Sequence, residues 1–207
     1  MRLYIKGDYT KEIPFDYLEL AKKMWFENYQ GESIPLSYSG FRQIRDRNDI
    51  AIHLKLDKQD YDERWLHIPI QEGIKYHFYS QIDEDLNLEF EHAYVTDFRE
   101  NGDCLRLIST HLELLTLDKR AFYIMAIEIA TIFNGQISED DKKTWITIDE
   151  FKEKHEDILS LTFEEANEMS LEEIQMIDAI DDPIWEELDR KREEYIKIHG
   201  ERVCDDD

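Results

Sequence analysis

The sequence predicts an α+β fold, in which an antiparallel sheet of about five or six strands packs on a central buried helix and an acidic helical segment follows. Short alternating or β-branched segments, separated by turn residues, fill the first half of the chain. A nearly all-apolar stretch at 119–133 has the length and the ends of a buried helix. Beyond it, carboxylates and helix-start signals dominate. With 42% apolar and 12% aromatic residues, the chain can bury a core despite its charge.

The first expected elements are a strand and a helix. Residues 1–6 alternate in polarity, which is typical of an edge strand. After Pro14, apolar residues recur at helical spacing and the pattern ends at Gly31, so we expect a helix of about 15 residues. The stretch 31–40 is rich in turn-forming residues and contains Pro35, so we expect a loop there.

Further strands are expected in the first half of the chain, because short apolar segments alternate with charged or glycine-containing turns. These segments are 41–44, 50–56, 65–70, 74–79, 86–96 and 104–109. A last short hairpin is expected at 136–147, around the charged turn 139–143. Together the segments predict one antiparallel sheet.

The strongest helix is expected at 119–133. Asp118 precedes it as a plausible N-cap, and Asn134 with Gly135 follows it as a C-cap. Apolar residues leave this helix almost no polar face, and Glu128 is the one carboxylate within it. A helix that is apolar all round is buried, so we place it across the sheet as the central core helix.

The C-terminal third is expected to be helical because four helix starts are visible. One of them is Asp182 followed by Pro183, which begins a helix expected at 183–198. The others match the capping box, in which a hydroxyl and a carboxylate bind unpaired backbone N–H groups. These boxes pair Thr147 with Glu150, Thr162 with Glu165, and Ser170 with Glu173. We therefore expect a core domain at 1–146, an acidic helical segment docked on it at 147–200, and a disordered acidic tail at 201–207.

Charge restricts the class of partner. The chain carries a net charge of −24, and residues 139–207 hold 25 Asp and Glu against 9 Lys and Arg, a net of −16. Such a field repels nucleic acid and anionic lipid and attracts basic protein surfaces. The basic cluster around Arg42, Arg45 and Arg47 is too small to offset this charge, so we expect no direct nucleic-acid binding. We expect this basic cluster to form salt bridges with the acidic tail.

A cytoplasmic location is expected. The N-terminus lacks the apolar stretch of a signal peptide, and the longest apolar run, 121–133, is too short to span a bilayer of about 30 Å. Cys104 and Cys204 form no C-x-x-C pair and no disulfide framework. We therefore expect neither a membrane span nor a disulfide or zinc scaffold.

No metal site is predicted. Asp83, Asp85 and Asn87 imitate the start of a calcium loop, but Leu88 and Tyr94 stand where that loop needs glycine and a bidentate glutamate. An acidic hairpin turn is the better interpretation.

Histidines are the other potential metal ligands. His53, His67 and His77 fall on expected strands, and His111 with Glu113 is the nearest approach to a paired ligand motif. Zinc and iron sites show tighter ligand pairs than these, so hydrogen-bonded histidines on the sheet surface are the simpler interpretation.

No catalytic residue or cofactor is predicted. The chain has no nucleophile elbow, no Cys-His signature and no phosphate-binding glycine loop. Glu128 is the one carboxylate whose pKa burial could raise, as in general acids. A position at the helix rim, or a bond to a neighbouring hydroxyl or arginine, is the alternative for this residue. An enzyme would need a pocket where Glu128 or the strand histidines converge.

The acidic segment is either a set of solvated helix faces or a patch complementary to a basic protein. Carboxylates of the capping boxes bind backbone amides at helix starts, so they are not counted among the partner-binding residues. Trp185 offers an aromatic anchor among the rest. The expected partner-binding residues are Glu172, Asp178, Asp181, Asp182, Trp185, Glu186, Glu187 and Asp189.

Residues 120–154 resemble a pattern found in bacterial polymorphic-toxin immunity proteins. In that pattern a buried helix is followed by a turn of the form G-x-I-S-x-D-x-x-x-W and a capped helix. Here the match begins at Gly135, Trp145 comes one residue later than the pattern has it, and the capped helix follows Thr147. The resemblance implies a cytoplasmic, non-enzymatic inhibitor that covers the active site of a basic toxin such as a nuclease. The alternative is a DNA mimic from a phage or mobile element, which would carry rows of carboxylates along an elongated molecule.

Overall fold

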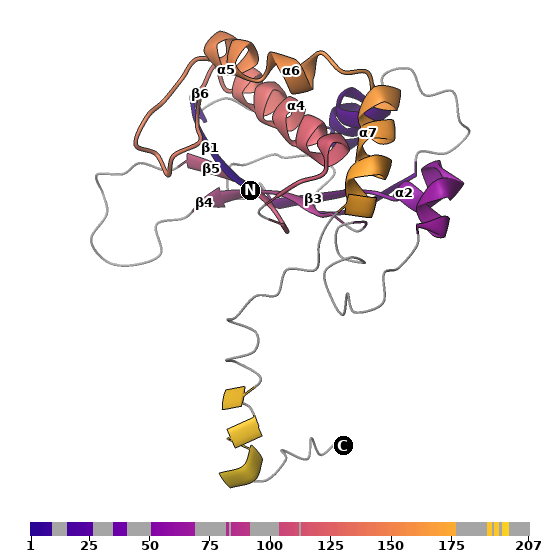
Figure 1. Ribbon diagram of the computed structural model, residues 1–207. Helices are drawn as coiled ribbons and strands as arrows, with labels where there is room; N and C mark the ends of the chain where they lie inside the picture. The colour runs from indigo at the N-terminus through magenta and orange to yellow at the C-terminus, as the bar shows by residue number, and fades with distance from the viewer. Residues whose placement is uncertain are drawn as a thin grey trace.

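The computed structural model contains one six-stranded antiparallel sheet with helices on one of its faces, which confirms the α+β class (Figure 1). It describes residues 1–9, 16–26, 35–40, 51–68, 82, 84–91, 104–111, 113–176, 190, 191, 193, 194 and 196–198. The strand order is β2-β3-β4-β5-β1-β6. The strands are β1 (Arg2–Lys6), β2 (Leu36–Gly40), β3 (Ala51–Leu56), β4 (Leu86–Glu91), β5 (Cys104–Ser109) and β6 (Gln136–Ser138).

The helical elements divide into a group before β4 and a group after β5. The first group is α1 (Tyr17–Ala21), the π-helical η1 (Lys22–Phe26), α2 (Lys58–Tyr61) and the 3₁₀-helical η3 (Glu63–His67). The second group is α4 (Thr116–Ile132), α5 (Ile148–Lys154), α6 (Glu156–Leu159) and α7 (Phe163–Met176). The described residues between 190 and 198 are helical too. No helix in the described part of the chain is long and apolar enough to cross a membrane.

Strand register assembles the core. Leu3 pairs with Leu107, Leu107 with Leu88, and Leu88 with Ile52, so one apolar row crosses four strands. All four side chains are buried. Because strand side chains alternate between faces, this register turns the leucine and isoleucine positions of the row toward one face of the sheet.

Helix α4 is the central core helix that the sequence predicts, but it begins three residues earlier. Asp118 is not its N-cap: it lies inside the first turn, is buried, and pairs with Lys58. The helix ends as expected, since Asn134 adopts a φ of 49° and the Gly135 amide donates to the Ala130 carbonyl at 2.8 Å. At Gly135 a Cβ would lie 2.3 Å from the Lys6 carbonyl oxygen, so only glycine fits there.

Several other boundaries differ from the sequence-based expectation. β1 is not an edge strand, because β5 and β6 pair with its two sides. β2 lies in the stretch expected to be a loop, where it pairs with β3. Residues 65–67 belong to η3 rather than to a strand. The expected strands at 41–44 and 74–79 lie outside the described residues.

Helices α5, α6 and α7 all contact α4 and form the outer helical layer (Figure 1). The capping boxes at Thr147 and Thr162 start α5 and α7 as predicted. The third expected start is wrong: Ser170 and Glu173 lie within the continuous helix α7. Their side chains cap a different helix, as described below.

Candidate protein-binding surface

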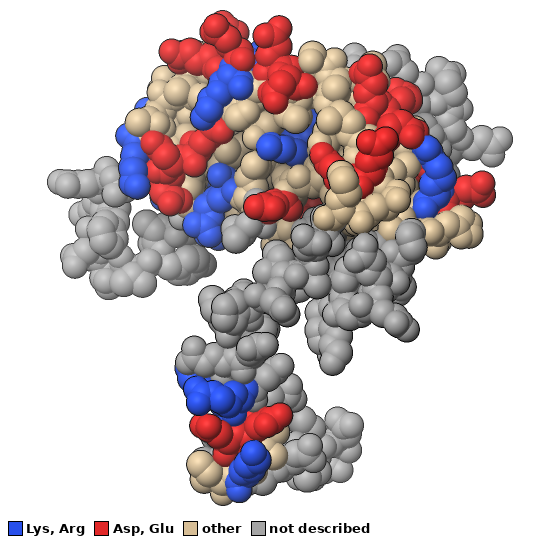
Figure 2. Space-filling model, in the orientation of Figure 1, with Lys and Arg blue, Asp and Glu red and all other residues tan. Residues whose placement is uncertain are grey.

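Helix α7 is amphipathic, with carboxylates on its outer face. Ala166, Leu171 and Ile174 are buried on its inner face. The outer face carries no Lys or Arg within the helix and exposes Met169 and Met176. Its exposed carboxylates are Glu164, Glu165, Glu168 and Glu172. Figure 2 shows acidic side chains over α7 and, along the top of the molecule, over α5 and α6.

The inner face of α7 caps the core helix α4. The first turn of α4 has no side-chain cap of its own. Instead, the Thr116 amide donates to a Glu173 carboxylate oxygen and the Leu117 amide donates to Ser170 Oγ, each at 2.8 Å. Two of the amide groups that a helix start leaves unpaired are therefore bound by α7. This contact fixes α7 to the centre of the fold.

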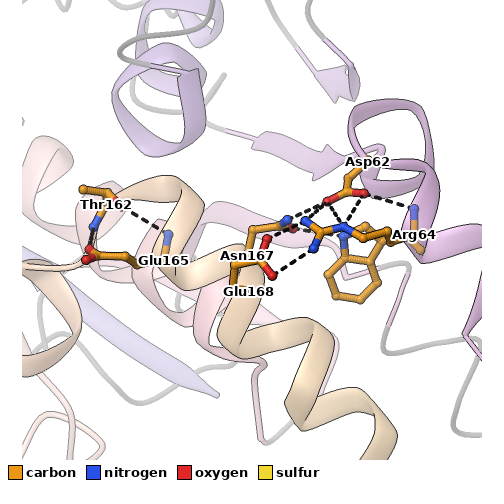
Figure 3. A network of polar contacts seen from close by, with 7 residues as sticks. Asp62, Arg64, Thr162, Glu165, Asn167 and Glu168 are labelled. Atoms are coloured by element: carbon orange, nitrogen blue, oxygen red, sulfur yellow. Dashed lines mark hydrogen bonds and ion pairs between the residues drawn. The ribbon is translucent and has the colours of Figure 1, made fainter.

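A second polar network holds the middle of α7 against η3 (Figure 3). Trp65 Nε1 donates to Asn167 Oδ1 at 3.0 Å, and Asn167 Nδ2 donates to Asp62 at 2.8 Å. The Arg64 guanidinium bridges Asp62 and Glu168 with hydrogen bonds of 2.5 to 3.1 Å. Trp65 and Asn167 are buried, whereas Arg64 and Glu168 are about half exposed. The network therefore positions part of the acidic face from within the core.

These contacts favour the ionised forms of Asp62 and of two carboxylates on α7, Glu165 and Glu168. Hydrogen bonding to Arg64 lowers the pKa of Asp62 to about 2 and also lowers the pKa of Glu168. The Thr162 amide and hydroxyl form the capping box with Glu165, and the bond from the amide lowers the pKa of Glu165. Because these pKa values fall, Glu165 and Glu168 on the outer face of α7 stay ionised into the acidic pH range.

Residues 147–176 as a whole hold 10 Asp and Glu against 2 Lys. Some of these carboxylates cap helices or pair with Arg64. The remaining carboxylates of this segment are exposed and form no hydrogen bond or ion pair with the part of the chain that the structure describes. These are Asp149, Glu153, Glu156, Asp157, Glu164 and Glu172. They are the carboxylates that a basic partner could bind without breaking an internal contact.

A groove of about 630 Å³ separates α4 from α5 and α6. Ile124, Ile127 and Leu159 form its apolar part. Its polar lining consists of Glu128, Lys152, Glu153, Glu156 and Ser160. The Glu128 carboxylate is about a quarter exposed and pairs with Lys23 of η1. Glu128 therefore lies at the helix rim, in agreement with the alternative to burial that the sequence left open.

Only one predicted partner-binding residue can be located. Glu172 is exposed on α7, beside the other outer-face carboxylates. The other seven lie outside the described residues: Asp178, Asp181, Asp182, Trp185, Glu186, Glu187 and Asp189. Sequence reasoning missed Glu164, although its place outside the apolar period of α7 would have identified an exposed carboxylate.

The histidines do not assemble into a metal centre in the described ranges, where no group of three or more His, Cys, Asp or Glu could hold an ion. His53 contacts Asn87 on the neighbouring strand, and His67 ends η3. His111 contacts the buried carboxylate of Glu84. Glu113 is exposed, and His77 lies outside the described residues, as does Asp83 of the calcium-like sequence.

A buried ion pair beneath α4 was not predicted from the sequence. Lys58 Nζ lies 2.9 Å from Asp118 Oδ2 and donates to the Ile82 carbonyl at 2.8 Å. Burial raises the pKa of Asp118 to about 6, although the charge of Lys58 and its hydrogen bond act to lower it. Both side chains are almost fully enclosed, so we assign the pair to the core and not to the surface site.

Comparison with known proteins found no matching family model, no similar curated protein and no similar solved structure.

Proposed function

We propose that this protein is a non-catalytic inhibitor, of the immunity type, that neutralises a basic bacterial toxin by covering its active or substrate-binding surface. The observation that carries this proposal is the anchoring of α7, whose outer carboxylates sit on a helix tied to the core at Ser170, Glu173 and Asn167. A fixed anionic face loses little conformational freedom when a cationic partner binds. It also attracts such a partner over a distance, which raises association rates by about 10- to 1,000-fold.

The DNA mimic is the alternative from a different class of protein. A mimic needs carboxylates in rows along an extended body. In the described part of the chain the unpaired carboxylates are spread over three consecutive helices that all contact α4. This compact arrangement supports the inhibitor over the mimic.

The proposal is tested by capture followed by inhibition. The full chain is immobilised, bound proteins are recovered from lysate at low and at high salt, and each captured protein is produced and assayed with the free chain added. We expect a basic toxin whose binding weakens steeply with salt and whose activity the chain blocks. A captured partner that binds equally at both salt concentrations, or that keeps full activity, would contradict the proposal.

The same assay separates the two alternatives. An inhibitor of a toxin blocks that toxin's own activity, whereas a mimic competes with duplex DNA for a host defence enzyme. Capture of a restriction or defence enzyme that DNA displaces would therefore replace the toxin inhibitor with the mimic.

A further inference from the structure

We infer that the groove between α4 and α5–α6 is a binding site for an arginine side chain of the basic partner. This inference rests on the proposed function in naming a protein as the source of the arginine. The site is distinct from the outer face of α7, because none of its lining residues belongs to that helix. It gives a role to Glu128, the partly exposed carboxylate at the rim of α4.

The groove has room for a long side chain, and part of its lining can cover an apolar stem. Its volume of about 630 Å³ lies within the usual range for ligand pockets, about 300–1,000 Å³. Ile124 and Ile127 are one helical turn apart on α4, and Leu159 faces them from α6. Aliphatic surface of this kind covers the methylene groups of arginine while its charged end reaches the rim.

The charge of the lining fits a cation. Glu128 approaches from α4, while Glu153 and Glu156 approach from the opposite wall. Lys152 also lines the groove, and Lys23 pairs with Glu128 from outside it, so one carboxylate remains in excess over these two cations. The surrounding helices add to this excess, since residues 147–176 hold eight further carboxylates and one further lysine outside the lining of the groove.

Arginine suits this site better than lysine for two reasons. Its guanidinium is weakly hydrated, so placing it against isoleucine and leucine side chains costs less than placing an ammonium there. Its several donors can also contact carboxylates on both walls at once. Lys23 does not block access, because its own side chain is more than half exposed and can return to water when a guanidinium binds Glu128.

The test uses N-acetyl-arginine-methylamide as the probe and the full chain with labelled Ile and Leu methyl groups, followed by NMR. N-acetyl-citrulline-methylamide is the neutral control, because it has nearly the same shape without the charge. We expect the methyl signals of Ile124, Ile127 and Leu159 to shift and saturate with the arginine probe and not with the citrulline probe. Shifts that never saturate, that appear equally with citrulline, or that spread over all methyl groups would overturn the inference.

Variants identify the carboxylates involved. Glu128→Gln with Glu156→Gln should weaken the probe about fivefold to tenfold, as expected for losing one or two partly exposed ion pairs. Glu164→Gln with Glu172→Gln on α7 removes the same charge outside the groove and should leave the probe affinity unchanged. If both double variants weaken probe binding equally, the effect comes from the overall negative charge of the protein, and the inferred site is wrong. The comparison of the two probes on the parent chain needs no variant, so a poorly folded variant does not remove the test.

The two proposals can fail separately. If a basic toxin is inhibited equally well by the Glu128→Gln, Glu156→Gln variant, the arginine site is wrong and the inhibitor stands. If the arginine probe saturates the groove but no basic toxin is bound or inhibited, the inhibitor is wrong and the groove remains a guanidinium site.

Discussion

Replacing Lys58 with methionine tests whether the buried ion pair is an obligatory part of the core. The Lys58 side chain is fully buried, with Nζ 2.9 Å from Asp118 and 2.8 Å from the Ile82 carbonyl. Methionine keeps the length and apolar bulk of lysine but leaves the Asp118 carboxylate without its cation. Breaking a buried pair by removing one partner costs about 3–5 kcal/mol, so we expect Lys58→Met to lose that much unfolding free energy near neutral pH.

The cost should depend on pH in a direction that the pKa of Asp118 determines. Burial raises that pKa from 3.8 to about 6, so the folded state binds this proton more tightly than the unfolded state does. The contribution of Asp118 to stability therefore falls as pH rises through this window, by at most about 3 kcal/mol at about 1.4 kcal/mol per pKa unit. Without Lys58 the pKa of Asp118 rises further, and the loss continues to higher pH. Lys58→Met should thus be more damaging at about pH 8 than at about pH 5.

Urea unfolding, followed by circular dichroism at both pH values, measures this difference. Lys22→Met is the matched control, because Lys22 forms an exposed pair with Glu19, and we expect it to leave the stability close to that of the parent chain. The double variant Lys58→Met, Asp118→Leu should recover most of the loss, since well-packed apolar side chains replace buried ion pairs at little cost. Three results would refute the reasoning: a single variant that loses less than about 1 kcal/mol at about pH 8, an equal loss at both pH values, or a double variant as unstable as the single one.

Three further outcomes are expected. Glu173→Ala removes a cap of α4 and should cost about 1–2 kcal/mol in urea unfolding, whereas the neighbouring Glu172→Ala should cost little; equal effects would contradict the capping role. Gly135→Ala places a methyl group where a carbonyl oxygen of β1 lies 2.3 Å away, so we expect a clear drop in melting temperature, and an unchanged one would speak against this close approach. Glu186→Lys with Glu187→Lys should slow association with the basic partner in stopped-flow measurements, most strongly at low salt, and salt-independent association would count against the acidic patch.

Local signals explain the parts of the fold that the sequence predicted well. β5 begins and ends where the alternation of apolar residues does, at Cys104–Ser109. The capping boxes at Thr147 and Thr162 lie at real helix starts because each pairs a hydroxyl and a carboxylate with amides only three residues away. Such information is contained in a few consecutive residues and does not depend on the rest of the chain.

Tertiary contacts explain the errors. Ser170 and Glu173 have the spacing of a capping box. Their side chains can accept a hydrogen bond from any unpaired backbone amide, and here those amides belong to the first turn of α4. Asp118 precedes an apolar helix as a cap would, yet Lys58, 60 residues earlier, binds its carboxylate. Sequence spacing identifies a side chain that can bind a backbone amide or a cation. It does not predict which amide or cation the fold places beside that side chain.

Carboxylates that cap a helix and carboxylates without an internal partner should act differently on a basic protein. Glu165 caps α7 and remains charged. It therefore attracts a basic partner over a distance, although its carboxylate is already hydrogen-bonded within the capping box. Glu164, one residue earlier, is exposed and makes no hydrogen bond or ion pair with other described residues.

Glutamine at position 165 would remove the charge and keep the cap, because the capping box accepts glutamine. Glu165→Gln should therefore slow association with a basic partner and leave dissociation unchanged, whereas Glu164→Gln should affect both rates if Glu164 touches the partner. Stopped-flow and dissociation measurements on this pair of neighbours would separate steering from contact on one turn of α7, and a faster dissociation for Glu165→Gln alone would reverse the assignment.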